Sequence, residues 1–124
     1  MNKQIKIAIS KPILPVIIFS ENKLYSADKY VDLENILIKI IKDIKINDIK
    51  IIDSTGGEYF FMEKIFSIMP DFFGHRFSKK QIIDLFNNNC KNKENRYEIK
   101  SLSNKKIAEI VKHIAELIRI DNKK

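Results

Sequence analysis

The stretch of sequence that best indicates the fold class is VIIFSENKLY, residues 16–25. Its first four residues are apolar, and a short continuous apolar run is typical of a buried central strand. Glu21-Asn22 then marks a tight turn, because Asn tolerates the positive φ that two-residue hairpin turns require. Leu24-Tyr25 begins a returning strand, so the stretch predicts a β-hairpin.

A second hairpin is predicted further along the chain. Residues 49–52 have the pattern of an apolar strand, and residues 58–62 have the pattern of its partner strand. The turn between them contains Gly56-Gly57, where glycine accepts positive φ. We expect the second strand to continue to about Phe66. Isoleucine alternates with polar or small residues over 5–9, which predicts a half-buried strand ahead of the first hairpin.

Two helices are predicted between these strands and after them. Apolar side chains recur at three- and four-residue intervals over 33–44, which predicts a helix at about 29–45. Ser78 and Gln81 have the spacing of a capping box, in which each side chain satisfies a free backbone N–H at the start of a helix. We expect this second helix to end at the asparagines 87–89.

The C-terminal part of the chain predicts one more strand and one more helix. Tyr97 and Ile99 alternate with charged neighbours, as in a strand. Ser103 is positioned to cap a helix whose apolar stripe runs over 107–118. Together these elements predict a single α+β domain over 1–124, with a mainly antiparallel sheet and about three helices packed on it.

Composition bounds the class of protein. The chain has 124 residues, of which 44% are hydrophobic, so one domain can bury a core without disulfides. Cys90 is the single cysteine, which excludes an internal disulfide and a Cys-rich zinc site. The sequence has no signal-peptide pattern and no run near the roughly 20 apolar residues of a membrane span. We therefore expect a cytoplasmic protein that does not enter a membrane.

Charge is distributed unevenly along the chain. The net charge is +7, yet residues 21–71 carry a net −3 while residues 72–124 carry a net +7. A basic region can meet phosphate, and the acidic stretch can meet a cationic partner. The sequence is also rich in Ile, Lys and Asn, a bias typical of an AT-rich genome, which weakens a functional interpretation of the lysines.

The sequence shows no convincing enzyme active site, so an enzyme would need an arrangement that matches none of the motifs considered next. Gly56-Gly57 lacks the spacing and the Lys-Ser/Thr pair of a phosphate-binding loop. The sequence also has no nucleophile elbow and no His/Asp/Glu cluster with metal-ligand spacing. His75 and His113 are the minimum pair for a metal-independent ribonuclease, as general acid and base. We expect a protein that is not an enzyme, with no cofactor, no bound metal and no small-molecule substrate.

Two segments are expected to carry side chains beyond the core. They are the hairpin turn at Gly56-Gly57 and the aromatic-rich loop 70–76. Carboxylates there would complement a cationic cleft, and aromatic residues and arginine are common in the centre of protein interfaces. The candidate partner-binding residues are Asp53, Glu58, Tyr59, Asp71, Phe72, His75 and Arg76.

Part of the chain resembles small bacterial immunity proteins, the inhibitors encoded beside polymorphic toxins such as those of contact-dependent growth inhibition. The resemblance lies in the strand 15–19, the turn, the strand start at 24–26 and a helix from about Tyr30. The pattern over 51–59, an apolar strand, an acidic residue, a glycine turn and a strand, also resembles that group. It implies a cytoplasmic protein that forms a heterodimer with one cognate toxin, which we expect to be a nuclease, and covers its active site.

Two other classes of function stay open at this point. Immunity proteins that inhibit nucleases are often acidic, whereas this chain is basic overall. The alternative is a small basic nucleic-acid-binding protein that uses the C-terminal half, although nucleic acid is not the partner we favour. A ribonuclease that uses His75 and His113 is the third hypothesis.

Overall fold

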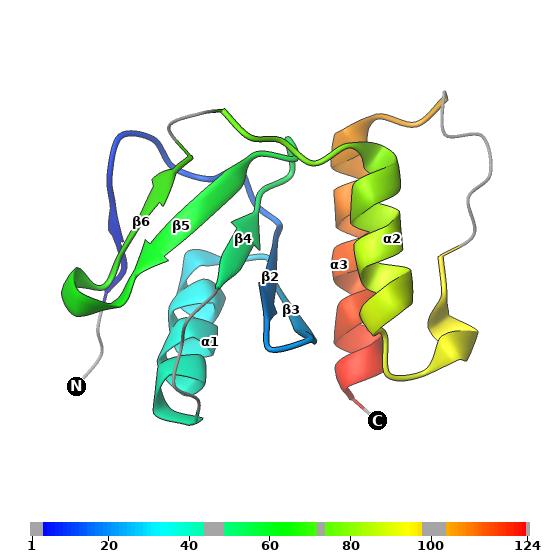
Figure 1. Cartoon of the computed structure of the whole chain (residues 1–124), viewed down its shortest axis with the longest axis horizontal. Helices are drawn as coiled ribbons and strands as arrows, with labels where there is room; N and C mark the ends of the chain where they lie inside the picture. The colour runs from blue at the N-terminus through cyan, green and yellow to red at the C-terminus, as the bar shows by residue number, and fades with distance from the viewer. Residues whose placement is uncertain (1–3, 44–48, 72–73, 98–103, 124) are drawn as a thin grey trace.

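A computed structural model describes residues 4–43, 49–71, 74–97 and 104–123. The six strands of this described part form one sheet, and three α-helices and two short 3-10 turns complete it, which confirms the predicted α+β class (Figure 1). The strands are β1 (Lys6–Ile7), β2 (Val16–Ser20), β3 (Lys23–Ala27), β4 (Lys50–Ile52), β5 (Glu58–Met62) and β6 (Ser67–Pro70). The helices are α1 (Tyr30–Asp43), α2 (Lys79–Asn89) and α3 (Ile107–Asn122), and the turns are η1 (Glu63–Ile65) and η2 (Lys93–Asn95).

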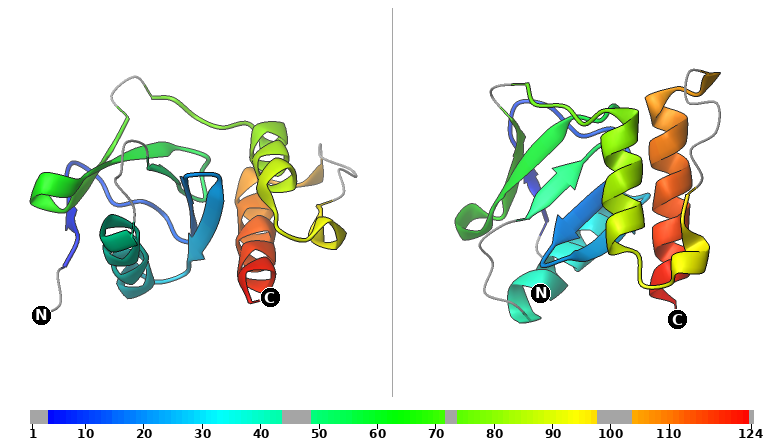
Figure 2. Two further views of the ribbon diagram at one scale, coloured as in Figure 1. Left: turned by 60° about the horizontal axis from the view of Figure 1, so that its bottom comes forward. Right: turned by 45° about the vertical axis from the view of Figure 1, so that its right-hand side comes forward.

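The sheet lies between two layers of helix. Its strand order is β1-β6-β5-β4-β2-β3, and every neighbouring pair is antiparallel except β1 with β6. Helix α1 covers one face, while α2 and α3 cover the β4-β2-β3 part of the other (Figures 1 and 2). In β2, Val16 and Ile18 pack toward α1 and Ile17 packs toward α2 and α3. A strand buried on both faces has no polar side to present, which explains the continuous apolar run.

Both predicted hairpins are confirmed. Ser20 pairs with Lys23 across the first turn, and the two residues between them, Glu21 and Asn22, have φ of 51° and 63°. Strands β4 and β5 pair as the second hairpin. The capping box of α2 is also present, since the hydroxyl of Ser78 accepts from the Gln81 N–H and the Gln81 side chain accepts from the Ser78 N–H.

Three details of the strand prediction are wrong. The first strand covers only Lys6–Ile7, and the chain turns out of the sheet at Ile9, which has φ of 72°. Strand β5 stops at Met62 because η1 follows, and Phe66, with φ of 47°, reverses the chain into β6. The residues expected to extend β5, 63–66, instead form η1 and the reversal at Phe66, and the next antiparallel strand, β6, begins at Ser67. That strand also takes in Pro70, which we expected in the following loop.

The predictions for the C-terminal region have mixed outcomes. Tyr97 is not in a strand, because the side-chain amide of Asn87 binds both its N–H and its carbonyl, at 2.8 and 3.0 Å. Ile99 and the expected cap Ser103 lie outside the described residues. The last helix begins at Ile107 and follows Lys106, whose side chain makes no capping hydrogen bond. None of the described helices has the length and apolar character needed to cross a membrane.

Candidate functional site

The residues nominated from the sequence gather around one pocket of about 150 Å³. It lies where the β4–β5 turn meets the loop after β6 and the segment ahead of β2. We call it the hairpin pocket, and its lining residues are Ser10, Asp53, Thr55, Gly57, Glu58, Tyr59, Pro70, Asp71, Gly74, His75 and Arg76. Six of the seven candidate partner-binding residues are among them, and the seventh, Phe72, lies outside the described residues.

Asp53 forms the inner wall of the pocket instead of projecting from it. Its side chain is 3% exposed. Oδ1 accepts from the Thr55 N–H, the Thr55 hydroxyl and the Gly57 N–H at 2.9, 2.6 and 3.1 Å, and Oδ2 accepts from the Ile13 N–H at 3.1 Å. The expectation that Asp53 reaches beyond the core is wrong, because this carboxylate satisfies the backbone of the turn and ties it to the segment ahead of β2.

Glu58 is also turned inward, and His75 stands between it and solvent. Glu58 is 8% exposed, and its Oε1 lies 2.8 Å from Nδ1 of His75, which is 53% exposed. The imidazole packs edge-on against Phe77, with ring centroids 5.3 Å apart. A partner at this surface would meet the histidine ring first, and the carboxylate would act through it. Glu58 is therefore a buried support for His75, contrary to the expectation that it projects.

Tyr59 belongs to the core and not to the exposed surface. It is buried, and it packs in the cluster that β2, β4 and α1 share. As the residue after Glu58 in β5 it points to the opposite face of the sheet, toward α1. The expectation that it projects from the hairpin is thus wrong, although it contributes to the lining of the pocket.

Backbone hydrogen bonds hold the outer loop against the hairpin. The Asp71 N–H donates to the Glu58 carbonyl at 3.0 Å, and the Asp71 side chain accepts from the His75 N–H at 3.2 Å. Further along, the Phe77 N–H donates to the Gly56 carbonyl at 2.7 Å, and Arg76 bridges to Gly57. The described part of this loop is therefore pre-organised, with His75 and Arg76 presented outward.

Two exposed isoleucines beside the pocket were not predicted from the sequence. Ile9 is 75% exposed and Ile13 is 57% exposed, and Ser10, between them, lines the pocket. The segment is fixed to the hairpin because the Ser54 N–H donates to the Ile13 carbonyl at 2.9 Å. The alternation over 5–9 predicts that Ile9 lies on the buried face of a strand, so its exposure was not expected. Singly exposed apolar residues are common on protein surfaces, and these two matter here because both belong to the segment that borders the pocket.

Ile9 also holds a strained backbone. A β-branched residue with positive φ is rare, because its Cβ crowds the carbonyl, and such strain is found mainly at functional sites.

We expect Ile9→Asn to stabilise the protein by roughly 0.5 to 1 kcal/mol, because Asn tolerates this conformation and little apolar area is lost. The urea midpoint measures the gain. Ile13→Asn, at a similarly exposed position without positive φ, is the control and should give no gain; an unchanged or lower midpoint for Ile9→Asn contradicts the strain.

The two histidines have different surroundings. Nδ1 of His113, on the exposed side of α3, lies 3.4 Å from the hydroxyl of Tyr97, whose oxygen also accepts from Lys105 at 3.2 Å. His113 does not line the pocket that holds His75. Within the described residues, no three His, Cys, Asp or Glu side chains are placed to hold a metal ion.

Comparisons of the chain with protein-family models, with curated proteins and with solved structures found no match.

Proposed function

We propose that the protein is an immunity-type inhibitor, which binds a toxin domain in the cytoplasm and covers its active site as a heterodimer. The observation that carries this proposal is the convergence at the hairpin pocket. Residues from three separate segments meet there, and two exposed isoleucines, Ile9 and Ile13, lie in the segment that contributes Ser10. An apolar pair beside ordered polar groups is the composition of a protein-binding surface, where a few buried anchors supply most of the affinity.

The charge of the pocket suits a cationic partner. Its lining holds the partly exposed carboxylate of Asp71 and, behind it, the nearly buried carboxylates of Asp53 and Glu58, against one guanidinium, that of Arg76. The active-site cleft of a nuclease is cationic because it holds phosphates, and a negative pocket would complement that field. This supports a nuclease as the inhibited toxin, even though the chain as a whole carries +7.

The rigidity of the surface also supports an inhibitor. The hairpin, the described part of the loop after β6 and the segment at Ile13 are joined by hydrogen bonds through Asp53, Gly56 and Asp71. A surface that is ordered before binding loses less conformational entropy on association, so more of its contact energy appears as affinity.

The proposal requires a toxin gene beside this protein's gene, and the decisive experiment measures binding to the toxin domain that such a gene encodes. We expect Ile13→Asp to weaken binding by about a hundredfold, because a charge would be buried at the apolar part of the interface. The fold should tolerate the change, since the side chain is exposed. The matched control is Ile120→Asp, an exposed isoleucine on α3, which should bind normally. Calorimetry gives the affinity, and protection of cells that express the toxin gives the biological readout.

Two outcomes would overturn the proposal. Normal binding by Ile13→Asp and by the double variant Ile9→Asp/Ile13→Asp would remove this surface from the interface. Selective, sub-micromolar binding of RNA or DNA at physiological salt would favour the nucleic-acid-binding alternative. Binding that rests only on excess lysine is unselective and falls steeply as salt rises, because it depends on counterion release.

A further inference from the structure

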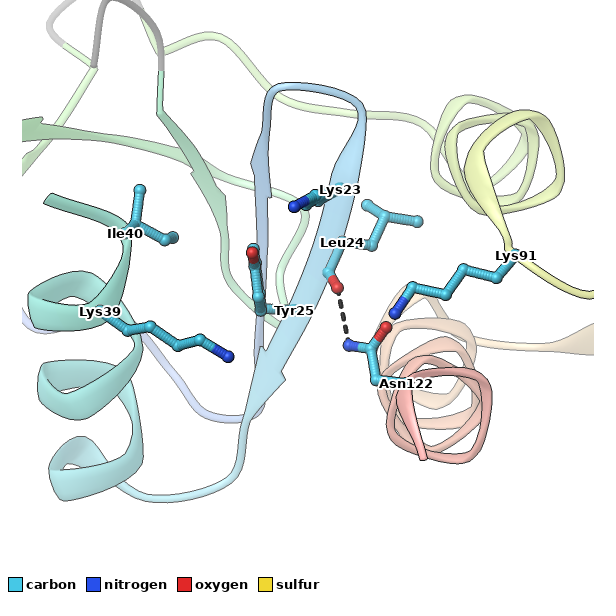
Figure 3. A pocket seen from close by; sticks show the side chains of 7 residues that line it. All are labelled: Lys23, Leu24, Tyr25, Lys39, Ile40, Lys91 and Asn122. Atoms are coloured by element: carbon cyan, nitrogen blue, oxygen red, sulfur yellow. Dashed lines mark hydrogen bonds between the residues drawn. The ribbon is translucent and has the colours of Figure 1, made fainter. Parts of the chain in front are cut away.

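A second pocket, of about 440 Å³, lies at the free edge of β3, the last strand of the sheet order (Figure 3). We call it the lysine pocket, and it is lined by Lys23, Leu24, Tyr25, Lys39, Ile40, Lys91 and Asn122. It is remote from the hairpin pocket, because the two lie at opposite ends of α3. Ile107, at the start of that helix, lies beside Gly56, whereas Asn122, at its end, binds Leu24.

Three lysines from separate segments converge on this pocket. Lys23 begins β3, Lys39 lies on α1, and Lys91 follows α2 (Figure 3). Within the described residues none of the three ammonium groups forms an ion pair. Like charges that face a common hollow repel one another, and an anion placed between them removes that repulsion. The pocket is therefore suited electrostatically to a ligand that carries more than one negative charge.

The walls of the pocket are fixed by the last turn of α3. Asp121 is buried, and its carboxylate accepts from the Lys91 N–H at 2.6 Å and from the Asn92 N–H at 2.9 Å. The Asn122 side-chain amide donates to the Leu24 carbonyl at 2.9 Å, as the dashed line in Figure 3 marks. One helix end thus holds the backbone of Lys91 and the edge of β3 together, so the pocket exists before any ligand arrives.

The pocket also offers apolar surface and a backbone edge. Tyr25 is half-buried and Ile40 is fully buried, and both line it. The bond from Asn122 shows that the main chain of Leu24 faces away from β2, so its N–H lies along the same open edge. A volume of about 440 Å³ is within the range of small-molecule sites. The features together fit an anion that has a ring or carbon body.

We infer that the lysine pocket binds a small phosphorylated molecule of the nucleotide class. A phosphate monoester carries nearly two charges and three acceptor oxygens, which match several separate ammonium donors better than a single carboxylate does. The base or sugar would rest on Tyr25, and the Asn122 oxygen is left to accept from a base amine. This binding activity goes beyond the inhibitor function and does not depend on it.

Titrations with adenosine monophosphate, inorganic phosphate and adenosine test the inference at about 150 mM salt, where weak surface attraction is screened. Adenosine monophosphate should bind most tightly, phosphate more weakly and adenosine least, as followed by NMR shifts at Tyr25 and Leu24. Phosphate binding as tight as the nucleotide would assign the site to free phosphate and overturn the nucleotide class. No saturable binding up to about ten millimolar would overturn the site itself.

Paired lysine variants give the control. Lys39→Ala/Lys91→Ala should lower affinity for adenosine monophosphate by about tenfold or more, because each charge-assisted contact contributes at this scale. Lys80→Ala/Lys112→Ala changes the net charge equally at exposed positions outside the pocket and should bind normally. Equal loss in both double variants would mean diffuse attraction and would overturn the inference. Melting temperatures should match the wild type, since all four side chains are exposed.

Discussion

Asp53→Ala should unfold the protein at a melting temperature roughly 15 °C below the wild type. The change removes four acceptor contacts from a side chain that is 3% exposed, and the N–H groups of Ile13, Thr55 and Gly57 lose their carboxylate partner. Each buried donor left unsatisfied costs about 1 to 3 kcal/mol, so the loss is on the order of 4 kcal/mol. That is a large fraction of the stability of an ordinary domain.

Two companion variants separate this effect from the loss of a negative charge. Asp28→Ala removes an exposed carboxylate that pairs with Arg119, and surface pairs contribute about 0 to 1 kcal/mol, so it should change stability little. Asp53→Asn keeps one acceptor oxygen but sets an amide against one of the N–H donors, so its melting temperature should fall between alanine and wild type. Thermal unfolding followed by circular dichroism measures all three. An Asp53→Ala variant as stable as Asp28→Ala would refute the assigned role.

Much of the fold follows from local sequence because local rules decide it. The turn at Glu21-Asn22 needs residues that tolerate positive φ, and the α2 start needs a side-chain acceptor at Ser78. Such signals lie within a few residues of the structure that they specify. The predicted length of the first strand was wrong because no local signal marks its end. Its pairing ends at Ile7 and Ile68 although β6 continues to Pro70, because the chain turns away at Ile9 with φ of 72°, and the alternation over 5–9 carries no signal for that turn.

The candidate site could be located from the sequence, but the orientation of its side chains could not. A carboxylate next to a glycine turn is equally consistent with a projecting side chain and with one that binds the turn. For Glu58 the deciding partner is His75, 17 residues further along the chain. The lysine pocket could not be predicted from the sequence either, because its residues are far apart in the chain. Lys23 and Lys39 come from the stretch that is net acidic, and only the packing of α1 and α3 around β3 brings them near Lys91.

Gly56→Ala is the second substitution with a large expected effect, because this glycine lies where the hairpin, α3 and the outer loop meet. Its φ is +85°, and an added Cβ would lie 2.6 Å from Cδ1 of Ile107 and 2.7 Å from the carbonyl oxygen of Phe77. The end of the isoleucine can rotate away, but the Phe77 carbonyl is backbone and is held by the Phe77 N–H bond to Gly56. Strain and overpacking together should cost roughly 3 kcal/mol.

Gly74→Ala is the matched control for Gly56→Ala. Its φ of +65° is also positive, but an added Cβ there meets no atom within 4 Å. Only the conformational cost applies, about 1 kcal/mol, so denaturant unfolding should place Gly74→Ala close to wild type and Gly56→Ala far below it. Equal losses would show that the close approach of Gly56 to Phe77 does not matter. The carbonyl of Gly56 positions the loop that carries His75 and Arg76, so if the proposed inhibitor function holds, Gly56→Ala should also weaken binding of the toxin at temperatures where the variant is still folded.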